Sequence, residues 1–172
     1  GGLGLGYTAH AILEGAAGAS LIVVEALAPV IEWHETGLLP LGAALANDPR
    51  CHLVQGDFFA KAAAQEGFDP DAPGRLFDAI LVDIDHSPDA LLDDRNGSFY
   101  QLDGLRRLTQ HLRPGGVFGL WSDASPDEAF VARLSRVFVD VRAEPVTFHN
   151  PLQDRPFTQT VYLARVQRGA TS

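Results

Sequence analysis

The sequence predicts an α/β fold built on a mostly parallel sheet, with helices on both faces and an antiparallel hairpin at the carboxyl end. Three observations support this prediction. Short apolar runs alternate with amphipathic stretches along the 172 residues, which is typical of a parallel sheet covered by helices. A glycine-rich turn opens the chain at the start of a helical pattern, as in nucleotide-binding α/β folds. The last two apolar runs, 139–148 and 158–166, are close enough to pair as a hairpin.

The elements of the first half follow from the apolar runs and the residues that interrupt them. An unbroken run rich in β-branched residues predicts a buried strand, whereas glycine and proline interrupt a helical pattern near Gly37 and Pro40. A cluster of Gly, Pro and Asp predicts a polar loop. The expected elements are helix 7–14, strand 20–25, helices within 27–46, strand 51–55, helix 58–66 and loop 67–75.

The second half is interpreted in the same way. A Pro-Gly-Gly sequence at 114–116 is expected to end a helix, because glycine and proline are typical of helix carboxyl ends. The expected elements are strand 76–82, a loop to about 97, helix 99–112, strand 117–121, helix 126–137 and the two hairpin strands. We expect one domain over 1–166 and a disordered tail over 167–172. Nothing precedes the glycine turn, so we expect the first strand of the sheet to be missing from this chain.

Composition narrows the functional classes. A net charge of −9 without a Lys/Arg cluster argues against nucleic acid, because phosphate binding needs a positive surface. The charge suits cationic or neutral small molecules. No apolar run approaches the length of a membrane span and no signal segment is evident, so no membrane partner is expected. The lone Cys51 lies in an apolar run and is expected to be buried, which fits a cytoplasmic location.

The opening turn is the first candidate binding site. Gly2, Gly4 and Gly6 stand at the start of a helix, where glycine permits a tight turn and a close approach of the backbone to a ligand. Glu25 follows the next strand about twenty residues on, where a carboxylate can accept hydrogen bonds from both ribose hydroxyls of a nucleoside. This spacing serves several cofactors, and the turn alone leaves NAD open.

Asp57 and the carboxylates after the next strand narrow the choice of ligand. In an open α/β sheet, ligands bind beyond the carboxyl ends of the strands. Asp57 could accept a hydrogen bond from an adenine amino group, with the Phe58 ring beside it, or it could cap the helix that starts at Phe58. Asp83 and Asp85 directly follow the strand predicted at 76–82.

With these residues the chain resembles the class I S-adenosylmethionine-dependent methyltransferase fold and, within it, the spermidine synthase (polyamine aminopropyltransferase) family. The resemblance covers nearly the whole chain. Its matching segments are the glycine turn, Val24-Glu25, Gln55-Gly56-Asp57, Phe77 to Asp83, Ser98-Phe99-Tyr100 and Leu112 to Gly116. It implies a Rossmann-like fold, a role in polyamine biosynthesis, an amine or other nucleophilic acceptor, and no metal. A homodimer is compatible with it.

The resemblance also implies roles for individual residues. The co-substrate would be decarboxylated S-adenosylmethionine or S-adenosylmethionine, held by the glycine turn, Glu25, Asp57, Phe58 and Asp83. Asp83 and Asp85 would attract the ammonium form of the acceptor and take its proton, beside Tyr100.

Two departures from the family pattern concern the donor and the acceptor. Gly4 stands where the family turn carries an aspartate that holds the cationic end of the aminopropyl donor. His86 stands where the second aspartate of the family loop would be, and histidine could serve as a base near neutral pH. The amine site is therefore expected to be changed.

Three alternatives stay open. The chain could transfer a methyl group from S-adenosylmethionine, whose own carboxylate an aspartate at Gly4 would repel. It could be a non-catalytic nucleotide-binding module that has lost its amine site. Finally, Asp83, Asp85 and His86 could ligate a divalent metal, although adjacent side chains on an extended segment point to opposite sides.

Overall fold

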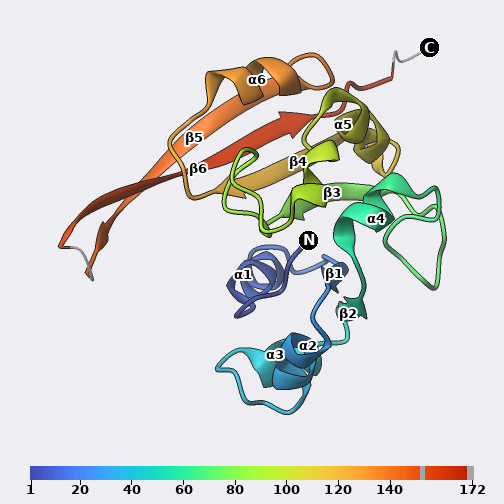
Figure 1. Ribbon diagram of the computed structural model, residues 1–172. Helices are drawn as coiled ribbons and strands as arrows, with labels where there is room; N and C mark the ends of the chain where they lie inside the picture. Colours follow the sequence, from blue (N-terminus) through green and yellow to red (C-terminus); the bar gives the residue numbers. More distant parts are fainter. Residues whose placement is uncertain (152–153, 170–172) are drawn as a thin grey trace. The chain divides into compact units, whose positions relative to one another are not determined.

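The computed structural model describes residues 1–151 and 154–169. The chain forms two compact units, Gly1–Pro73 (unit 1) and Gly74–Ser172 (unit 2) (Figure 1). Unit 1 carries a two-stranded sheet in the order β1-β2, and unit 2 a four-stranded sheet in the order β3-β4-β6-β5. Residues 167–169 lack regular secondary structure. The rest of the tail predicted to be disordered, 170–172, lies outside the described residues.

Unit 1 begins with the glycine turn and contains two parallel strands. Leu21 pairs with Cys51 and Glu25 pairs with Gln55, so β1 and β2 end at the same edge of their sheet. The elements are α1 (Tyr7–Gly15), β1 (Leu21–Glu25), α2 (Ala28–Glu35), α3 (Gly42–Ala46), β2 (Cys51–Gln55) and α4 (Phe58–Ala63). These bounds confirm the order predicted for the first half.

A buried apolar cluster holds the helices of unit 1 to its strands. It consists of Leu3, Ala9, Leu13, Val23, Leu45 and Cys51. Cys51 is buried as predicted, and burial raises the pKa of its thiol, which keeps the thiol uncharged and unreactive. Leu3 anchors the glycine turn in this cluster, whereas Gly4 and Leu5 of the same turn are exposed.

Unit 2 contains both parallel and antiparallel pairs. β3 runs parallel to β4, whereas β6 is antiparallel to both β4 and β5. The elements are β3 (Phe77–Val82), a 3-10 helix (Asp94–Ser98), α5 (Leu102–Thr109), β4 (Leu112–Ser122), α6 (Glu128–Leu134), β5 (Val139–Asn150) and β6 (Arg155–Arg165). The predicted α/β class, with parallel pairs and a carboxyl-terminal antiparallel hairpin, is confirmed.

Aromatic side chains form the core of unit 2. α5 contacts β4, α6 contacts β5, and the two helices contact each other (Figure 1). Tyr100 and Tyr162 each lie edge-on to Phe130, and Phe118 stacks on Phe138 with ring centroids 5.6 Å apart. Edge-on and stacked rings of this kind stabilise a core beyond their buried area. Tyr100 is therefore built into the packing of its unit.

The helix predicted over 99–112 is wrong at both ends. The helix starts only at Leu102, after Gln101, and ends at Thr109. Leu112 pairs with Phe77, and β4 continues through the Pro-Gly-Gly sequence expected to follow the helix. The buried Leu112 side chain and the main-chain bond from Gly115 N to Val166 O (3.1 Å) explain this, because sheet pairing overrides a local helix-ending pattern.

Candidate functional site

The glycine turn needs glycine at the three predicted positions. Gly2, Gly4 and Gly6 have φ angles of 86°, 49° and 87°, in the left-handed region that side chains with a Cβ seldom adopt. Gly2 N donates to Val24 O at 2.9 Å, and Gly6 N donates to Leu3 O at 2.8 Å. The turn is thus fastened to the carboxyl end of β1 by its backbone.

Gly4 and Gly6 differ in the space around them. A Cβ on Gly6 would lie 2.5 Å from Leu45 Cδ1 and 2.8 Å from His34 Cε1, whereas a Cβ on Gly4 would meet nothing within 4 Å. Gly6 precedes α1 without a side-chain cap, and the amino end of a helix attracts polar and negatively charged groups. Close packing therefore fixes Gly6, and open space surrounds Gly4.

Glu25 is bound to the turn from the end of β1. Its Oε2 accepts a hydrogen bond from Leu3 N at 3.0 Å, and its Oε1 accepts one from Leu27 N at 2.9 Å. A carboxylate has about four acceptor positions, so two remain for hydroxyl groups. The structure brings Glu25 and the turn together as the spacing predicted.

His34 fixes the turn from α2, and sequence reasoning did not single it out. Its side chain is completely buried, and Nε2 lies 3.0 Å from Gly4 O. Because a carbonyl only accepts, Nε2 must carry the proton, and within the described residues the buried Nδ1 has no hydrogen-bond partner. The signal was present in the spacing, since His34 lies three and four residues after Ile31 and Val30, on the apolar face of the helix.

Asp57 caps α4 at the edge where β1 and β2 end. Its Oδ1 accepts from Phe59 N at 2.8 Å and from Ala60 N at 3.1 Å, and Gly56 N donates to Glu25 O at 2.9 Å. The capping alternative for Asp57 is confirmed. Because both bonds use Oδ1, Oδ2 remains to accept from an adenine amino group, and that role stays a prediction.

Phe58 is less accessible than its predicted role suggests. The ring is 4% exposed and stacks on Phe68 with centroids 4.9 Å apart. A Cβ on Gly1 would lie 2.7 Å from Phe58 Cδ2, so the backbone of the chain start also lies against this ring. Packing within unit 1 occupies the ring, and its contact with adenine stays a prediction.

In unit 2, the segment after β3 separates its two carboxylates. Asp83 is exposed, whereas Asp85 is 1% exposed. The Asp85 carboxylate accepts hydrogen bonds from Leu92 N at 2.7 Å, Asn96 Nδ2 at 3.1 Å and Tyr100 OH at 2.8 Å. These bonds satisfy a buried charge and fold the segment back on itself.

Tyr100 shares this buried position. Its side chain is inaccessible to solvent, and burial, with the negative charge of Asp85 beside it, raises the pKa of Tyr100 well above its usual range. The phenol therefore stays protonated and donates to Asp85. The structure gives both residues a structural role, and their predicted catalytic roles stay predictions.

His86 turns to a different partner. Its Nδ1 lies 3.1 Å from Oδ2 of Asp123, which follows β4, and Asp123 N donates to His86 O at 2.7 Å. Sequence reasoning did not identify Asp123, because the contact depends on the pairing of β3 with β4.

No group of three or more His, Cys, Asp or Glu side chains within residues 1–151 and 154–169 could hold a metal ion.

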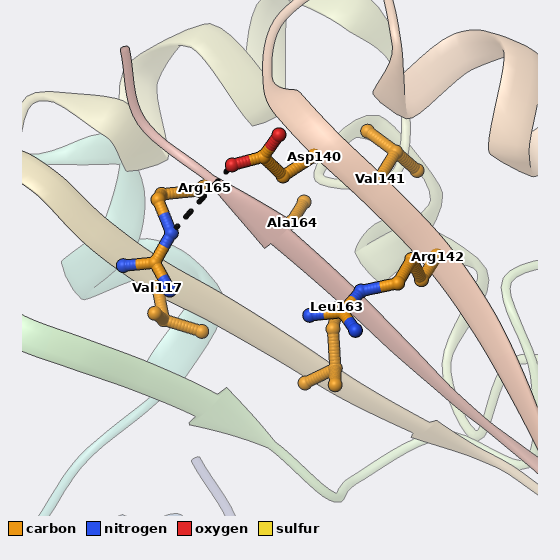
Figure 2. A pocket seen from close by; sticks show the side chains of 7 residues that line it. All are labelled: Val117, Asp140, Val141, Arg142, Leu163, Ala164 and Arg165. Atoms are coloured by element: carbon orange, nitrogen blue, oxygen red, sulfur yellow. Dashed lines mark ion pairs between the residues drawn. The ribbon is translucent and has the colours of Figure 1, made fainter. Parts of the chain in front are cut away.

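A pocket of about 340 Å³ lies elsewhere on unit 2. Figure 2 shows its lining, with Arg165 Nε 3.9 Å from Asp140 Oδ2. Val117, Leu163 and Arg142 also line it. Val117 lies near the start of the β3–β4 pairing, whereas Asp83 follows the end of β3. None of the predicted site residues lines this pocket.

Among the described residues, no helix has both the length and the apolar character that crossing a membrane requires.

Solved structures of similar fold include methyltransferases and spermidine synthases. Human methyltransferase-like protein 13 in complex with SAH has a TM-score of 0.68 and 17% identity, over 99% of this chain and 71% of that one. Spermidine synthase from Thermotoga maritima has a TM-score of 0.69 and 18% identity, over 95% and 51%. A SAM-dependent O-methyltransferase from Thermotoga maritima has a TM-score of 0.59 and 16% identity, over 99% and 59%.

These likenesses show the fold, which is the Rossmann-like α/β fold of methyltransferases and spermidine synthases. No protein-family model matches the chain. The chain spans about half the length of the Thermotoga maritima spermidine synthase.

Proposed function

We propose that this chain is a transferase domain that binds decarboxylated S-adenosylmethionine or S-adenosylmethionine and moves an aminopropyl group to an amine. One observation carries the proposal. Three left-handed glycines and the Glu25 carboxylate are joined by the Leu3 N–Glu25 Oε2 bond at the end of β1. The fold shared with spermidine synthases and methyltransferases supports it.

Donor binding is assigned to unit 1. The two remaining acceptor positions of Glu25 suit the ribose hydroxyls, and Oδ2 of Asp57 suits the adenine amino group. Asp57 Oδ1 is already committed to the amides of α4, which holds the carboxylate in one orientation. A fixed carboxylate binds a nucleoside with little loss of side-chain entropy.

Acceptor binding is assigned to the segment after β3 in unit 2. Asp83, Asp89 and Asp94 are exposed there, in a chain of net charge −9, and exposed carboxylates attract an ammonium group. The ammonium group first gives up a proton to a base or to solvent. The uncharged amine then attacks the carbon beside the positive sulfur, the carbon–sulfur bond breaks, and its electron pair neutralises the sulfur. The buried bonds of Asp85 hold the segment in place for this.

Methyl transfer is the second candidate, and Gly4 favours it. The turn has open space and no carboxylate at this position, so nothing there selects the cationic end of a decarboxylated donor. S-Adenosylmethionine carries its own carboxylate, which meets no like charge at Gly4.

A matched pair of variants distinguishes the two donors. Gly4→Asp and Gly4→Asn introduce side chains of nearly equal shape, and both residues tolerate a left-handed backbone better than most. We expect Gly4→Asp to bind decarboxylated S-adenosylmethionine more tightly than Gly4→Asn does, and S-adenosylmethionine more weakly, when both are titrated by calorimetry. Equal changes in the affinities of the two variants for each donor would mean that position 4 does not face the amino-bearing end of the donor.

The reaction itself is tested by product analysis. The wild type is incubated with each donor and a panel of amines and methyl acceptors, and transferred groups are detected by mass spectrometry. We expect transfer that Asp83→Asn reduces and the exposed control Asp103→Asn on α5 leaves unchanged. Donor binding without transfer to any acceptor would overturn the enzyme proposal in favour of a non-catalytic binding module.

A further inference from the structure

We propose that His86 and Asp123 form a catalytic dyad in which the imidazole takes the acceptor's proton and the carboxylate orients it. This inference rests on the proposed transferase function and deepens it, because it identifies the base. Neither carboxylate after β3 is as well suited. Asp85 is enclosed by its own donors, and an ordinary carboxylate is a weaker base at neutral pH than an imidazole.

The dyad lies where two parallel strands end. β3 ends at Val82, which pairs with Leu120 of β4, so the segments that follow the two strands start side by side. The main-chain bond from Asp123 N to His86 O, 2.7 Å long, joins these segments. In open α/β sheets, this edge is where substrates bind.

The side-chain bond fixes the tautomer of His86. A carboxylate only accepts hydrogen bonds, so Nδ1 of His86 donates to Oδ2 of Asp123 across 3.1 Å. In the neutral ring, the lone pair is then on Nε2. The His86 side chain is 61% exposed, and its Nε2 has no hydrogen-bond partner in residues 1–151 and 154–169. An exposed imidazole with its lone pair on Nε2 is what an incoming acceptor requires.

Several carboxylates lie close to the dyad in sequence, among them Asp89, which is exposed. Asp83 and Asp85 belong to the same segment as His86, and Asp127 follows Asp123 four residues later. Asp85 is held by Tyr100, and Asp127 accepts from the first amides of α6. Asp123 is therefore the carboxylate that contacts the ring directly, while Asp83 remains exposed to attract a cationic acceptor.

Other histidine–carboxylate pairs provide the comparison. His10 lies 3.4 Å from Glu14 within α1, and His149 lies 3.3 Å from Asp154 in the hairpin. Both are local in sequence, whereas the His86–Asp123 pair spans 37 residues and connects two strand ends. Asp154→Asn is therefore a matched control, because it removes the same kind of pair at the turn between β5 and β6, away from the carboxyl ends of β3 and β4.

The reaction needs no reactant besides the donor and the acceptor. The acceptor's nitrogen or oxygen forms a bond to the transferred carbon of the sulfonium donor. The carbon–sulfur bond breaks, and its electron pair remains on sulfur as a neutral thioether. The acceptor's proton moves to Nε2 of His86, and the Asp123 carboxylate lies beside the imidazolium that results. The proton then leaves to solvent.

Variants of each residue test the dyad by transfer kinetics. Loss of a general base costs roughly 10²–10⁴-fold in rate, so we expect His86→Ala to lower kcat/KM at least 100-fold and added imidazole to restore part of it. An amide at position 123 can donate to Nδ1 and place the proton on Nε2, so we expect Asp123→Asn to lower kcat/KM about tenfold or more. Asp154→Asn should match the wild type.

A second measurement is independent of activity. Nitrogen-15 NMR of labelled histidine reports which ring nitrogen carries the proton. We expect the Nδ1–H tautomer of His86 in the wild type and a shift away from it in Asp123→Asn, with donor binding and melting temperature unchanged because the main-chain bond at His86 O remains.

The outcomes separate the two proposals. If the wild type transfers no group from either donor, the proposed function fails and the dyad has no reaction to serve. If the wild type is active but His86→Ala retains full kcat/KM, or if the tautomer is the same in Asp123→Asn, the dyad is wrong while the transferase remains.

Discussion

His34→Leu is predicted to leave the stability of unit 1 almost unchanged while weakening the binding of donor. The substitution removes the bond from Nε2 to Gly4 O, 3.0 Å long, whose net contribution is about 1 kcal/mol. It also removes the buried Nδ1 that has no hydrogen-bond partner in the described residues, which relieves a cost of roughly 1–3 kcal/mol. The shape difference costs under about 1.5 kcal/mol. The sum runs from about 1.5 kcal/mol of destabilisation to about 2 kcal/mol of stabilisation.

The effect on the ligand is expected to be larger, because the lost bond holds the turn. Gly4 has open space around it, and without His34 its carbonyl is free to rotate away from the conformation that binds the donor. A penalty of about 1.4 kcal/mol raises Kd tenfold. Urea denaturation gives the stability, and calorimetric titration with S-adenosylmethionine gives Kd.

The control is His52→Leu, which makes the same exchange at an exposed position of β2. It should change neither quantity measurably. A loss of more than about 3 kcal/mol in the free energy of unfolding of His34→Leu, with Kd unchanged, would contradict this prediction. It would make His34 a packing residue with no effect on the turn.

Three further predictions follow from the geometry. Gly6→Ala should destabilise the chain by about 3 kcal/mol, because backbone strain adds to a clash with His34. Gly4→Ala should cost only about 1 kcal/mol, from strain alone. Denaturant midpoints of the two variants compare these losses of stability, and equal losses would show that packing does not distinguish the two positions. Tyr100→Phe should cost about 2 kcal/mol by removing a donor from a buried carboxylate, and an unchanged melting temperature would be inconsistent with that bond. The hydrogen bond from Arg95 lowers the pKa of Asp93 to about 2. The pair therefore stabilises the chain above about pH 4, and this contribution is lost as the pH falls toward 2. NMR titration of the Asp93 carboxyl group should show a higher pKa in Arg95→Gln than in the wild type.

The strands could be predicted because their signal is local. The unbroken apolar run ending at Glu25 and the one starting at Cys51 each predict a strand to within about one residue. The helix bounds in the region 99–112 could not be predicted from local sequence. They depend on the pairing of Leu112 with Phe77, which are far apart in sequence. The same holds for the separation into two units, which depends on contacts and leaves no trace in the pattern of apolar runs.

The candidate site was predictable where backbone conformation alone selects the residue. Gly2, Gly4 and Gly6 are such positions. The burial of Asp85 was not predictable, because its donors come from a segment that folds back by up to 15 residues. For His34, the spacing predicts the apolar helix face, but no motif predicts its bond to Gly4 O.

We propose that the glycine turn and Glu25 bind an adenosyl sulfonium compound. Calorimetric titration of the wild-type chain with S-adenosylmethionine, its decarboxylated form and NAD tests this binding. We predict saturable binding of at least one sulfonium donor, at one molecule per chain, and no binding of NAD at the same concentrations. Binding of NAD with no response to either sulfonium donor would contradict the account.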